Sequence, residues 1–561
     1  MDTPTRHAHL PSRPDEPPLD WGRLAKDFDA YVMDPANGVL FTNRDGHPAF
    51  TAFLEGHTGV DASHELVSYG PIVLGKALLG HDVTSLLPGL ADYFNEATGL
   101  TMNTPGETRI EMWYLMVVNA LAAHITRRLL SHDPASMARW QASVETLMAM
   151  ARSIDYDFDV QGYDFAARCP WTREDIYRQP DAVGGYGYLM LLAYETLRVP
   201  AYLEEARRAL GRYLAFERNP WYEVPSGALA AVATARLRAL GHDLNVERAV
   251  DFVLDPQAGM VTGTWGNREA HGLFRGWRHS QPESAYSMES LVVLPALLPV
   301  ARYVPHLAPG IATYALNVAA NARLFFSDTM RGQESRGDLT PAVTYERVYA
   351  AYEGHAPYAA GDCPGHKSIY GGGYALLWGA LVKPTRDPYI LQLDVASSDF
   401  LAGHVYPTTI HANPYATART IELDAGPEPV CLYDLTHHRT IAERVTGPIS
   451  LDLDPESARV VARVPAGAFY PAPKVDSAVV RVRVYDEPLV PAAVREQFFR
   501  VVRAGFGQKR KQLANSLGAG LALGRAAAAA ALGGAGIDPS RRAQTLSVAE
   551  WLRLTEVLGE G

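Results

Sequence analysis

The stretch Arg459-Val-Val-Ala-Arg-Val-Pro-Ala-Gly467 divides this 561-residue chain into two parts of different character. Before it lies a run of segments in which apolar and polar residues alternate. After it comes a Pro-rich segment, Ala468-Phe-Tyr-Pro-Ala-Pro-Lys-Val-Asp-Ser-Ala-Val-Val480. Strand periodicity therefore ends at this stretch, which we call the seam, and a separate C-terminal part begins there.

The residues just before the seam predict a small β-sandwich over residues 383–461. Alternation with a period of two residues is typical of half-buried strands, and Asp424-Ala-Gly-Pro427 is one of the turns between them. The strands are expected at Leu391-Gln-Leu-Asp-Val395, Thr420-Ile-Glu-Leu423, Val430-Cys-Leu-Tyr433, Ile449-Ser-Leu-Asp-Leu453 and Arg459-Val-Val461.

Residues 21–382 predict a mainly α body of about ten helices in consecutive hairpins. The best helix start is Thr104-Pro-Gly-Glu107, which has the pattern of a capping box. Helical hairpins allow a solenoid, a bundle or a closed (α/α) toroid. We favour the toroid because no repeat of fixed length is visible and the linkers 155–181, 255–282 and 327–371 are long.

Composition and charge narrow the class of protein. Residues 1–20 are polar and Pro-rich, so we expect a disordered tail, and no apolar run approaches the ~20 residues that span a bilayer. The three cysteines lie far apart, so neither disulfides nor thiol chemistry are expected, and we predict a cytoplasmic protein without a membrane partner.

The net charge of −11 is unevenly distributed along the chain: residues 468–561 carry +5 and the remainder −16. Only the C-terminal part suits a polyanion.

The long linkers of the helical body concentrate carboxylates beside aromatic residues. Such pairs suit carbohydrate chemistry, in which carboxyl groups handle protons and aromatic rings stack on sugar faces. Glu111 is interpreted as a partner of a helix dipole, and Cys363 and His366 alone do not predict a metal site. We expect no cofactor and no metal. The candidate catalytic residues are Glu283, Asp159, His279 and Glu353, and the candidate substrate-binding residues are Trp277, Tyr286, Asp157, His355 and Trp171.

A helical body followed by a β-sandwich resembles the six-hairpin glycosidase superfamily. The resemblance covers residues 21–461 and rests on architecture. It implies a carbohydrate substrate, with glycoside hydrolysis as the first choice. A polysaccharide lyase or a sugar epimerase is the alternative, with Tyr286, His279 or His355 handling the proton.

The C-terminal part carries three more specific blocks. They are Val464–Arg481, Phe506-Gly-Gln-Lys-Arg-Lys-Gln-Leu-Ala-Asn-Ser-Leu517 and Gly536-Ile-Asp-Pro-Ser-Arg-Arg-Ala543. In this order they resemble the C-terminal part of the small-subunit rRNA adenine dimethyltransferase family. The resemblance implies a small helical domain over residues 462–561 that binds ribosomal RNA weakly. The RNA-binding candidates are Lys509, Arg510, Lys511, Arg541 and Arg542.

The chemistry of that family has no counterpart in this sequence. Its methyltransferase half needs a Gly-rich loop after a first strand and a motif that grips the target adenine. Gly184-Gly-Tyr-Gly187 follows no strand, and Asn219-Pro-Trp-Tyr222 and Asn413-Pro-Tyr415 are interpreted as turns. We therefore expect no methyl transfer and interpret the chain as a fusion. The alternative of another class is a dimethyltransferase-related protein that only binds rRNA.

Overall fold

The computed structural model describes residues 9–54, 63–266, 268–326, 343–350, 358–359, 367–403, 405–465, 489–508 and 511–559. The chain forms two compact units, Met1–Asp476 and Ser477–Gly561, which we call the body and the tail unit. Each is described by itself.

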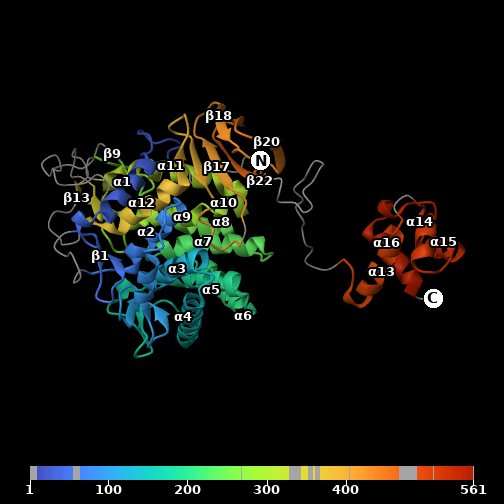
Figure 1. Cartoon of the computed structure of the whole chain (residues 1–561), viewed down its shortest axis with the longest axis horizontal. Coiled ribbons are helices and arrows are strands. Elements are labelled where there is room, and N and C mark those ends of the chain that lie inside the picture. The colour runs from blue at the N-terminus through green and yellow to red at the C-terminus, as the bar shows by residue number, and fades with distance from the viewer. Residues whose placement is uncertain are drawn as a thin grey trace. The chain divides into compact units, whose positions relative to one another are not determined.

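The body is mainly helical, which confirms the prediction from periodicity (Figure 1). Its α-helices are α1 (Trp21–Met33), α2 (Leu66–Leu78), α3 (Met112–Leu129), α4 (Pro134–Ser153), α5 (Ala182–Leu197), α6 (Pro200–Ala215), α7 (Val224–Ala239), α8 (Val246–Val253), α9 (Ser287–Leu297), α10 (Val300–Tyr303), α11 (Ala308–Asn321) and α12 (Ile369–Leu381).

Within the described residues, six of these helices contact one another in a closed order. The sequence of contacts runs α2, α3, α5, α7, α9 and α12, and α12 contacts α2 again. These inner helices are buried on nearly every side, as apolar helices without a polar face must be. Outer helices such as α6 and α8 are amphipathic; α6 packs mainly along α5 and also contacts α7, and α8 packs along α7.

The start of α3 differs from the sequence prediction. The backbone N–H and the hydroxyl of Thr104 both donate to Oε2 of Glu107, but the two residues close a turn, and α3 begins only at Met112. Glu283 similarly precedes a short strand, and α9 begins at Ser287. In both cases a strand just before the helix pairs with a distant linker strand, which periodicity within one segment does not reveal.

Short strands join the linkers of the helical ring. They are β1 (Leu40–Thr42), β2 (Pro48–Phe50), β3 (Phe94–Asn95), β4 (Leu100–Thr101), β5 (Arg109–Glu111), β6 (Gly162–Asp164), β7 (Cys169–Trp171), β8 (Thr264–Trp265), β9 (Arg268–Glu269), β10 (Ser284–Tyr286), β11 (Thr344–Tyr345), β12 (Arg347–Tyr349), β13 (Tyr358–Ala359) and β14 (Lys367–Ser368). β5 pairs with β6, and β10 pairs with β12. These pairs hold the linkers together at the starts of α3 and α9.

The expectation of a disordered tail over residues 1–20 needs correction for residues 9–20. Leu10 is buried in the body's core. Glu16 pairs with Arg268 and Arg323, and the side-chain amide of Asn317 donates to the carbonyl of Pro11 at 2.8 Å. The partners are hundreds of residues away in sequence, so composition alone gave no sign that this polar segment is held in place.

Close approach of α1 and α12 depends on Gly379. A Cβ at this position would lie 2.4 Å from the Cβ of Ala25 and 2.9 Å from the carbonyl oxygen of Trp21. We expect Gly379→Ala to lower the free energy of unfolding by about 1–3 kcal/mol, because a packed core has no room for the methyl group. Urea denaturation followed by tryptophan fluorescence measures this change.

The control for this prediction is Gly211→Ala in α6. Nothing lies within 4 Å of a Cβ at Gly211. Alanine is the better helix former, so this variant should be more stable than the wild type by roughly 0.5–1 kcal/mol. Equal destabilisation by both substitutions would contradict the packing argument.

Strands β15–β22 follow the ring and form two layers. They are β15 (Val382–Pro384), β16 (Leu391–Asp394), β17 (Thr408–Asn413), β18 (Arg419–Asp424), β19 (Val430–Asp434), β20 (Arg439–Val445), β21 (Pro448–Leu453) and β22 (Ser457–Pro465). The larger sheet has the order β15–β16–β17–β22–β19–β20, and β18 pairs with β21. β22 contains most of the seam and lies between β17 and β19.

The two faces of the larger sheet are covered differently. Leu393, Ile410 and Val460 belong to the core that the sheet shares with the helical ring. Leu432 and Val461 belong to a second core, which lies between this sheet and the β18–β21 pair. Figure 1 shows β17 and β22 beside α11, which contacts both strands. The seam strand is therefore a structural part of the body.

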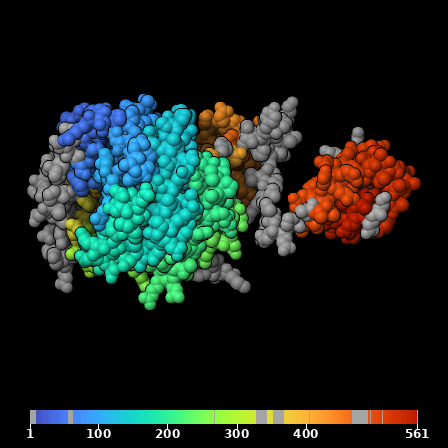
Figure 2. All heavy atoms as spheres, turned by 90° about the horizontal axis from the view of Figure 1, so that it is seen from below, coloured from blue at the N-terminus to red at the C-terminus, as the bar shows by residue number. Residues whose placement is uncertain are grey.

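The tail unit is a small helical bundle with its own core. Its helices are α13 (Arg495–Phe506), α14 (Leu513–Gly520), α15 (Arg525–Gly534) and α16 (Val548–Gly559). Trp551 packs in this core with Phe498, Val501 and Leu517. Figure 2 shows the atoms of this unit, orange to red, closely packed together. Across the described residues no single helix has the length and apolar character to cross a membrane, although the bent pair α14–α15 has both when taken together.

Candidate active site

Acidic residues gather where the inner helices begin. Glu65, Glu111, Asp181 and Glu223 are the N-cap residues of α2, α3, α5 and α7. Glu289 lies in the first turn of α9. The N-terminal end of a helix carries partial positive charge, which offsets part of the cost of burying a carboxyl group there.

These carboxyl groups lie close enough to influence one another. Glu223 interacts electrostatically with Glu289, Glu111 and Asp181. Glu289 interacts with Glu346, which precedes β12, and Glu346 interacts with Glu65. The phenol of Tyr114, in the first turn of α3, is affected by Glu65, Glu223, Glu289 and Glu346. We call Glu65, Glu111, Asp181, Glu223, Glu289 and Glu346 the acidic cluster.

Side-chain amides orient one member of the cluster. Glu111 accepts hydrogen bonds on both carboxylate oxygens, from Gln161 at 2.8 Å and from Gln179 at 3.0 Å. Both glutamines are buried, and Gln179 also accepts from the backbone N–H of Trp113 at 2.8 Å. An acceptor held by two amide donors suits an ionised carboxylate.

Glu65 is held in a similar way. Its oxygens accept from the side-chain amide of Asn103 at 2.6 Å and from the hydroxyl of Tyr370 at 2.7 Å. Tyr370 lies in the first turn of α12, so this bond joins the starts of α2 and α12. Residues 305 positions apart in sequence therefore meet at the rim of the ring.

Glu223 and Asp181 are buried but incompletely paired. Their exposed fractions are 7% and 1%. Asp181 accepts with Oδ2 from the backbone N–H groups of Tyr222 and Glu223, at 3.1 and 3.3 Å. Within the described part of the chain, Oδ1 of Asp181 and Oε2 of Glu223 have no hydrogen-bond partner. A buried unpaired carboxyl oxygen is costly, which makes this pair a site for a proton or a ligand.

Burial raises the pKa of four members of the cluster. It raises the pKa of Glu289 to about 8 and the pKa values of Asp181 and Glu346 to about 7. The pKa of Glu223 is raised well above its ordinary value by burial and then by its acidic neighbours. At neutral pH the cluster therefore holds carboxyl groups that retain protons, as a general acid requires.

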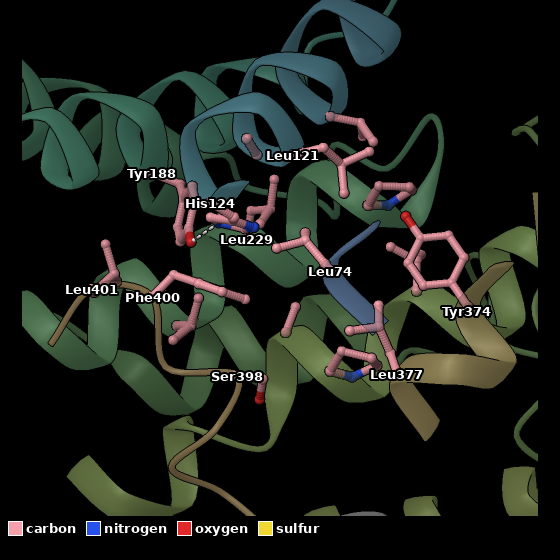
Figure 3. Close-up of a pocket in the computed structure, with 17 residues that line it drawn as sticks. Leu74, Leu121, His124, Tyr188, Leu229, Tyr374, Leu377, Ser398, Phe400 and Leu401 are labelled. Carbon is pink, nitrogen blue, oxygen red and sulfur yellow. Dashed lines mark hydrogen bonds between the residues drawn. The ribbon is translucent and has the colours of Figure 1, made fainter. Parts of the chain in front are cut away.

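The floor beneath the cluster is apolar. A cavity of about 60 Å³ lies within the ring and is lined by Leu74, Val117, Leu121, Leu229 and Tyr374 among others, with contributions from every inner helix (Figure 3). Val292 and Tyr374 line it about one helical turn beyond Glu289 and Tyr370, and Pro225 lines it two residues beyond Glu223. Apolar surroundings of this kind add to the burial that raises the pKa values of the acids.

Residues from the sheet region close the far end of this cavity. Phe400 stacks on His124, with ring centroids 3.9 Å apart, and His124 is hydrogen-bonded to Tyr188 (Figure 3). Asp399 anchors this loop, because it accepts from Arg302 at 2.8 Å and from Tyr303 at 2.6 Å.

Aromatic side chains stand beside the acidic cluster. The rings of Tyr177 and Trp277 are stacked, with centroids 5.4 Å apart, and Tyr222 lies 6.1 Å from Trp277. Trp277 is partly exposed, so it can offer a face to a sugar ring. Tyr222 directly precedes Glu223, which connects this aromatic group to the buried acid.

The sequence-predicted catalytic residues lie outside the acidic cluster. Asp159 is half-exposed and lies 4.0 Å from Arg178, and Asp157 next to it is exposed. Glu283 and His279 are exposed on the linker that carries Trp277. The structure does bring His279 within 5.7 Å of Trp277. Glu353 and His355, like Cys363 and His366, lie outside the described residues.

Two predicted substrate-binding residues have structural partners. Trp171 lies in β7, with the guanidinium of Arg109 3.9 Å from its ring. Tyr286 is the N-cap residue of α9 and accepts from Arg347 at 3.1 Å. Burial raises the pKa of Tyr286 to about 12, which suits a neutral hydrogen-bonding phenol.

Sequence analysis missed most of the acidic cluster. Glu111 was considered only as a helix-dipole partner, and Glu65, Asp181, Glu223 and Glu346 were not selected. One signal was available: an acidic residue immediately precedes α2, α3, α5 and α7. An acidic N-cap is common in helices of every kind, so this signal becomes informative only when the helices are known to begin at the same end of one ring.

The raised pKa values predict that the body loses stability as pH rises. In the folded state the carboxyl groups of Asp181, Glu346 and Glu289 keep their protons up to pH 7–8. In the unfolded chain carboxyl groups release their protons near pH 4. Between these limits unfolding releases protons, so the free energy of unfolding falls as pH rises and levels off above pH 8. Glu289→Gln should flatten this slope by about 1.4 kcal/mol per pH unit, the value for one proton.

Urea denaturation between pH 5 and pH 8 measures that slope. Tryptophan fluorescence reports mainly on the body, because eight of the nine tryptophans precede the seam. Glu217→Gln, which changes an exposed glutamate of the same body, is the matched control and should keep the wild-type slope. Stability that rises with pH over this interval would contradict the prediction.

The basic residues of the tail unit differ in whether they are exposed and whether they pair with an acidic residue. Arg541 pairs with Glu550 and holds the pKa of that carboxyl down, to about 2. Lys511 and Arg542 are exposed. Lys509 and Arg510 lie outside the described residues. Exposed Phe499 and Phe506 lie on α13 near Arg503, also exposed, so this helix presents aromatic and cationic groups together.

Comparison with known proteins supports the resemblance in the C-terminal part. Residues 456–560 match the family model described as ribosomal RNA adenine dimethylase. A ribosomal RNA small subunit methyltransferase A from Dehalococcoides mccartyi is 46% identical over 95 residues, which are 17% of this chain and 33% of that protein. One from Anaeromyxobacter is 42% identical over 130 residues, 22% of this chain and 45% of that protein. The chain thus spans less than half the length of these relatives.

Several solved structures that are similar to part of this chain are of carbohydrate-related proteins. They include a family 76 glycoside hydrolase from Bacteroides thetaiotaomicron, with 10% identity, a TM-score of 0.43 and coverage of 64% of this chain and 77% of that one. A D-mannose isomerase has 13% identity and a TM-score of 0.43 and covers 65% of this chain and 99% of that one. A cellobiose 2-epimerase from Spirochaeta thermophila has 13% identity and a TM-score of 0.40, covering 64% and 96%.

Proposed function

We propose that the body is a glycoside hydrolase whose acid and base come from the acidic cluster. The observation that carries this proposal is the buried pair Glu223 and Asp181, in which each residue has one unpaired carboxyl oxygen at the starts of the inner helices. Glycoside hydrolysis requires two carboxyl groups in different environments, and the buried Glu223 and the amide-bound Glu111 would supply them.

In this proposal Glu223 is the general acid and Glu111 is the accepting carboxylate. Glu223 donates its proton to the glycosidic oxygen as the bond from that oxygen to the anomeric carbon breaks. Glu111, oriented by Gln161 and Gln179, either activates the water that attacks the anomeric carbon or attacks it directly. Asp181 fixes the backbone of Tyr222 and Glu223 and thereby positions the acid.

We favour hydrolysis over lyase or epimerase chemistry because of the protonation and the exposure of the side chains that could transfer a proton. An epimerase or lyase needs a base that removes a proton from carbon. Tyr286 has its pKa raised to about 12 by burial, so it is neutral at pH 7, and His279 is exposed. The acidic cluster, by contrast, provides both a protonated and an accepting carboxyl group.

The test is incubation of the purified chain with glucose- and mannose-based oligosaccharides of differing linkage. Newly formed reducing ends are measured chemically, and the anomer first released is identified by NMR. We expect at least one linkage to be cleaved. Interconversion of sugars without new reducing ends would instead favour the epimerase alternative, and an unsaturated product would favour the lyase.

We propose for the tail unit a separate, weak binding of ribosomal RNA without chemistry. Its support is the match of residues 456–560 to a ribosomal RNA adenine dimethylase model, together with the exposed cations Lys511 and Arg542. We further propose that the chain is a fusion of these two parts and acts in the cytoplasm. Sequencing genomic DNA across residues 457–480 tests the fusion.

A further inference from the structure

The acidic cluster contains more carboxyl groups than hydrolysis needs. Two suffice for the acid and the base, yet Glu223 is faced by Glu289 and Asp181 as well as by Glu111. The nearby cations face other acceptors: Arg278 donates to the carbonyls of Trp221 and Pro220. Arg347 donates to the hydroxyl of Tyr286. Arg278 acts electrostatically on Asp181 and Arg347 on Glu346, but within the described residues neither is hydrogen-bonded to the cluster, so its acidity is compensated only in part.

Unpaired buried oxygens mark where a ligand would bind. Oε2 of Glu223 and Oδ1 of Asp181 are without partners in the described structure, although both residues are more than nine-tenths buried. Each can accept a hydrogen bond from a ligand that supplies donors and positive charge. An organic cation with N–H groups supplies both.

We propose that this site takes a saccharide that bears a protonated primary amine, with the ammonium group held between Glu223 and Asp181. The inference rests on the proposed function and names its substrate class. An ammonium group has three donors and no acceptor, which matches a set of carboxyl oxygens. The aromatic group of Trp277 and Tyr177 would receive the apolar face of the sugar ring.

Amine binding must be linked to proton release. Without ligand the cluster retains protons at neutral pH, because burial and mutual repulsion raise the pKa values of its members. An ammonium group pairs with ionised carboxylates, so its binding expels protons. Glu111, Glu346 and Arg278 also face these groups and contribute to the linkage. Affinity for the amine should rise from pH 5 toward pH 7.5 and fall once the amine itself loses its proton.

The experiment is titration calorimetry of the full chain with D-glucosamine, D-glucose and N-acetyl-D-glucosamine. The last sugar is the matched neutral derivative, because acetylation removes the charge from the same nitrogen. We expect glucosamine to bind at least about tenfold more tightly than either neutral sugar, since charge-assisted hydrogen bonds are roughly twice as strong as neutral ones. Titrations at pH 6.5 in buffers of different ionisation heat should show proton release with glucosamine only.

Two variants test whether the preference for glucosamine depends on Glu223. Glu223→Gln should reduce the preference for glucosamine to within about threefold, and the exposed Glu217→Gln should leave it unchanged. Glucose or N-acetylglucosamine binding as tightly as glucosamine would overturn the inference and leave the proposed function standing. Failure of all three sugars, with no oligosaccharide cleaved, would overturn both. An amine preference that persists in Glu223→Gln would also overturn the inference, because the ammonium would then be held elsewhere.

Discussion

Replacing Glu223 by glutamine should lower kcat/KM for the best oligosaccharide substrate by about 10²–10⁴-fold, the range that a general acid contributes. Glutamine keeps the size of the side chain but has no acidic proton. Asp181 accepts from the backbone of residues 222 and 223, so the start of α7 should keep its geometry in the variant. The measurement is release of reducing ends at saturating and limiting substrate concentrations.

The pH profile separates a catalytic role for Glu223 from a structural one. In the wild type the activity should persist into the neutral and mildly alkaline range, because burial raises the pKa of Glu223. A loss of activity at high pH reports deprotonation of the acid. Glu111→Gln should also abolish turnover, because it removes the carboxylate that activates the water or attacks the anomeric carbon.

A control variant and a control substrate test whether Glu223 is the general acid. Glu217→Gln changes an exposed glutamate of the same body and should retain wild-type activity. A substrate with a highly activated leaving group needs little protonation, so Glu223→Gln should lose far less activity on it than on a natural glycoside. Equal losses on both substrates, or wild-type activity of Glu223→Gln, would exclude Glu223 as the acid.

Methyl transfer from S-adenosylmethionine to unmethylated small-subunit rRNA should be absent with the purified chain, whereas an intact relative should incorporate label. The match to the dimethylase model covers only residues 456–560. Methylation of a base requires a pocket that holds both the cofactor and the extruded adenine. The described part of the tail unit is a small helical bundle around one core, not the α/β domain that holds the cofactor in the family.

RNA binding, measured in parallel, should be weak and strongly dependent on salt. The triple substitution of Lys509, Arg510 and Lys511 by alanine should weaken binding and reduce the slope of log affinity against log salt by about two units, as loss of three phosphate contacts predicts. Arg386→Ala, an exposed cation of the body, is the control and should change neither quantity. Label incorporation above the blank, or binding insensitive to salt, would contradict this pair of expectations.

The sequence by itself determined the broad organisation of this protein. Helical spacing predicted the mainly helical body, alternation predicted the strands before the seam, and the blocks after the seam identified the ribosomal RNA adenine dimethylase-like part. It also indicated aromatic and acidic linkers, and Trp277 does stand beside Tyr177 and Tyr222. These features are local, because a spacing or a motif is contained within a few turns of one segment.

Tertiary structure alone decided which acids come together. Glu65, Glu111, Asp181, Glu223 and Glu289 are spread over 225 positions of sequence, and each precedes or begins a different inner helix. They meet because the inner helices contact one another in a closed order with their N-terminal ends at the same rim. The raised pKa values follow from burial over the apolar floor, and burial depends on all the helices at once. Half-exposed Asp159 and exposed Glu283 have the same side-chain chemistry but lie outside that buried environment.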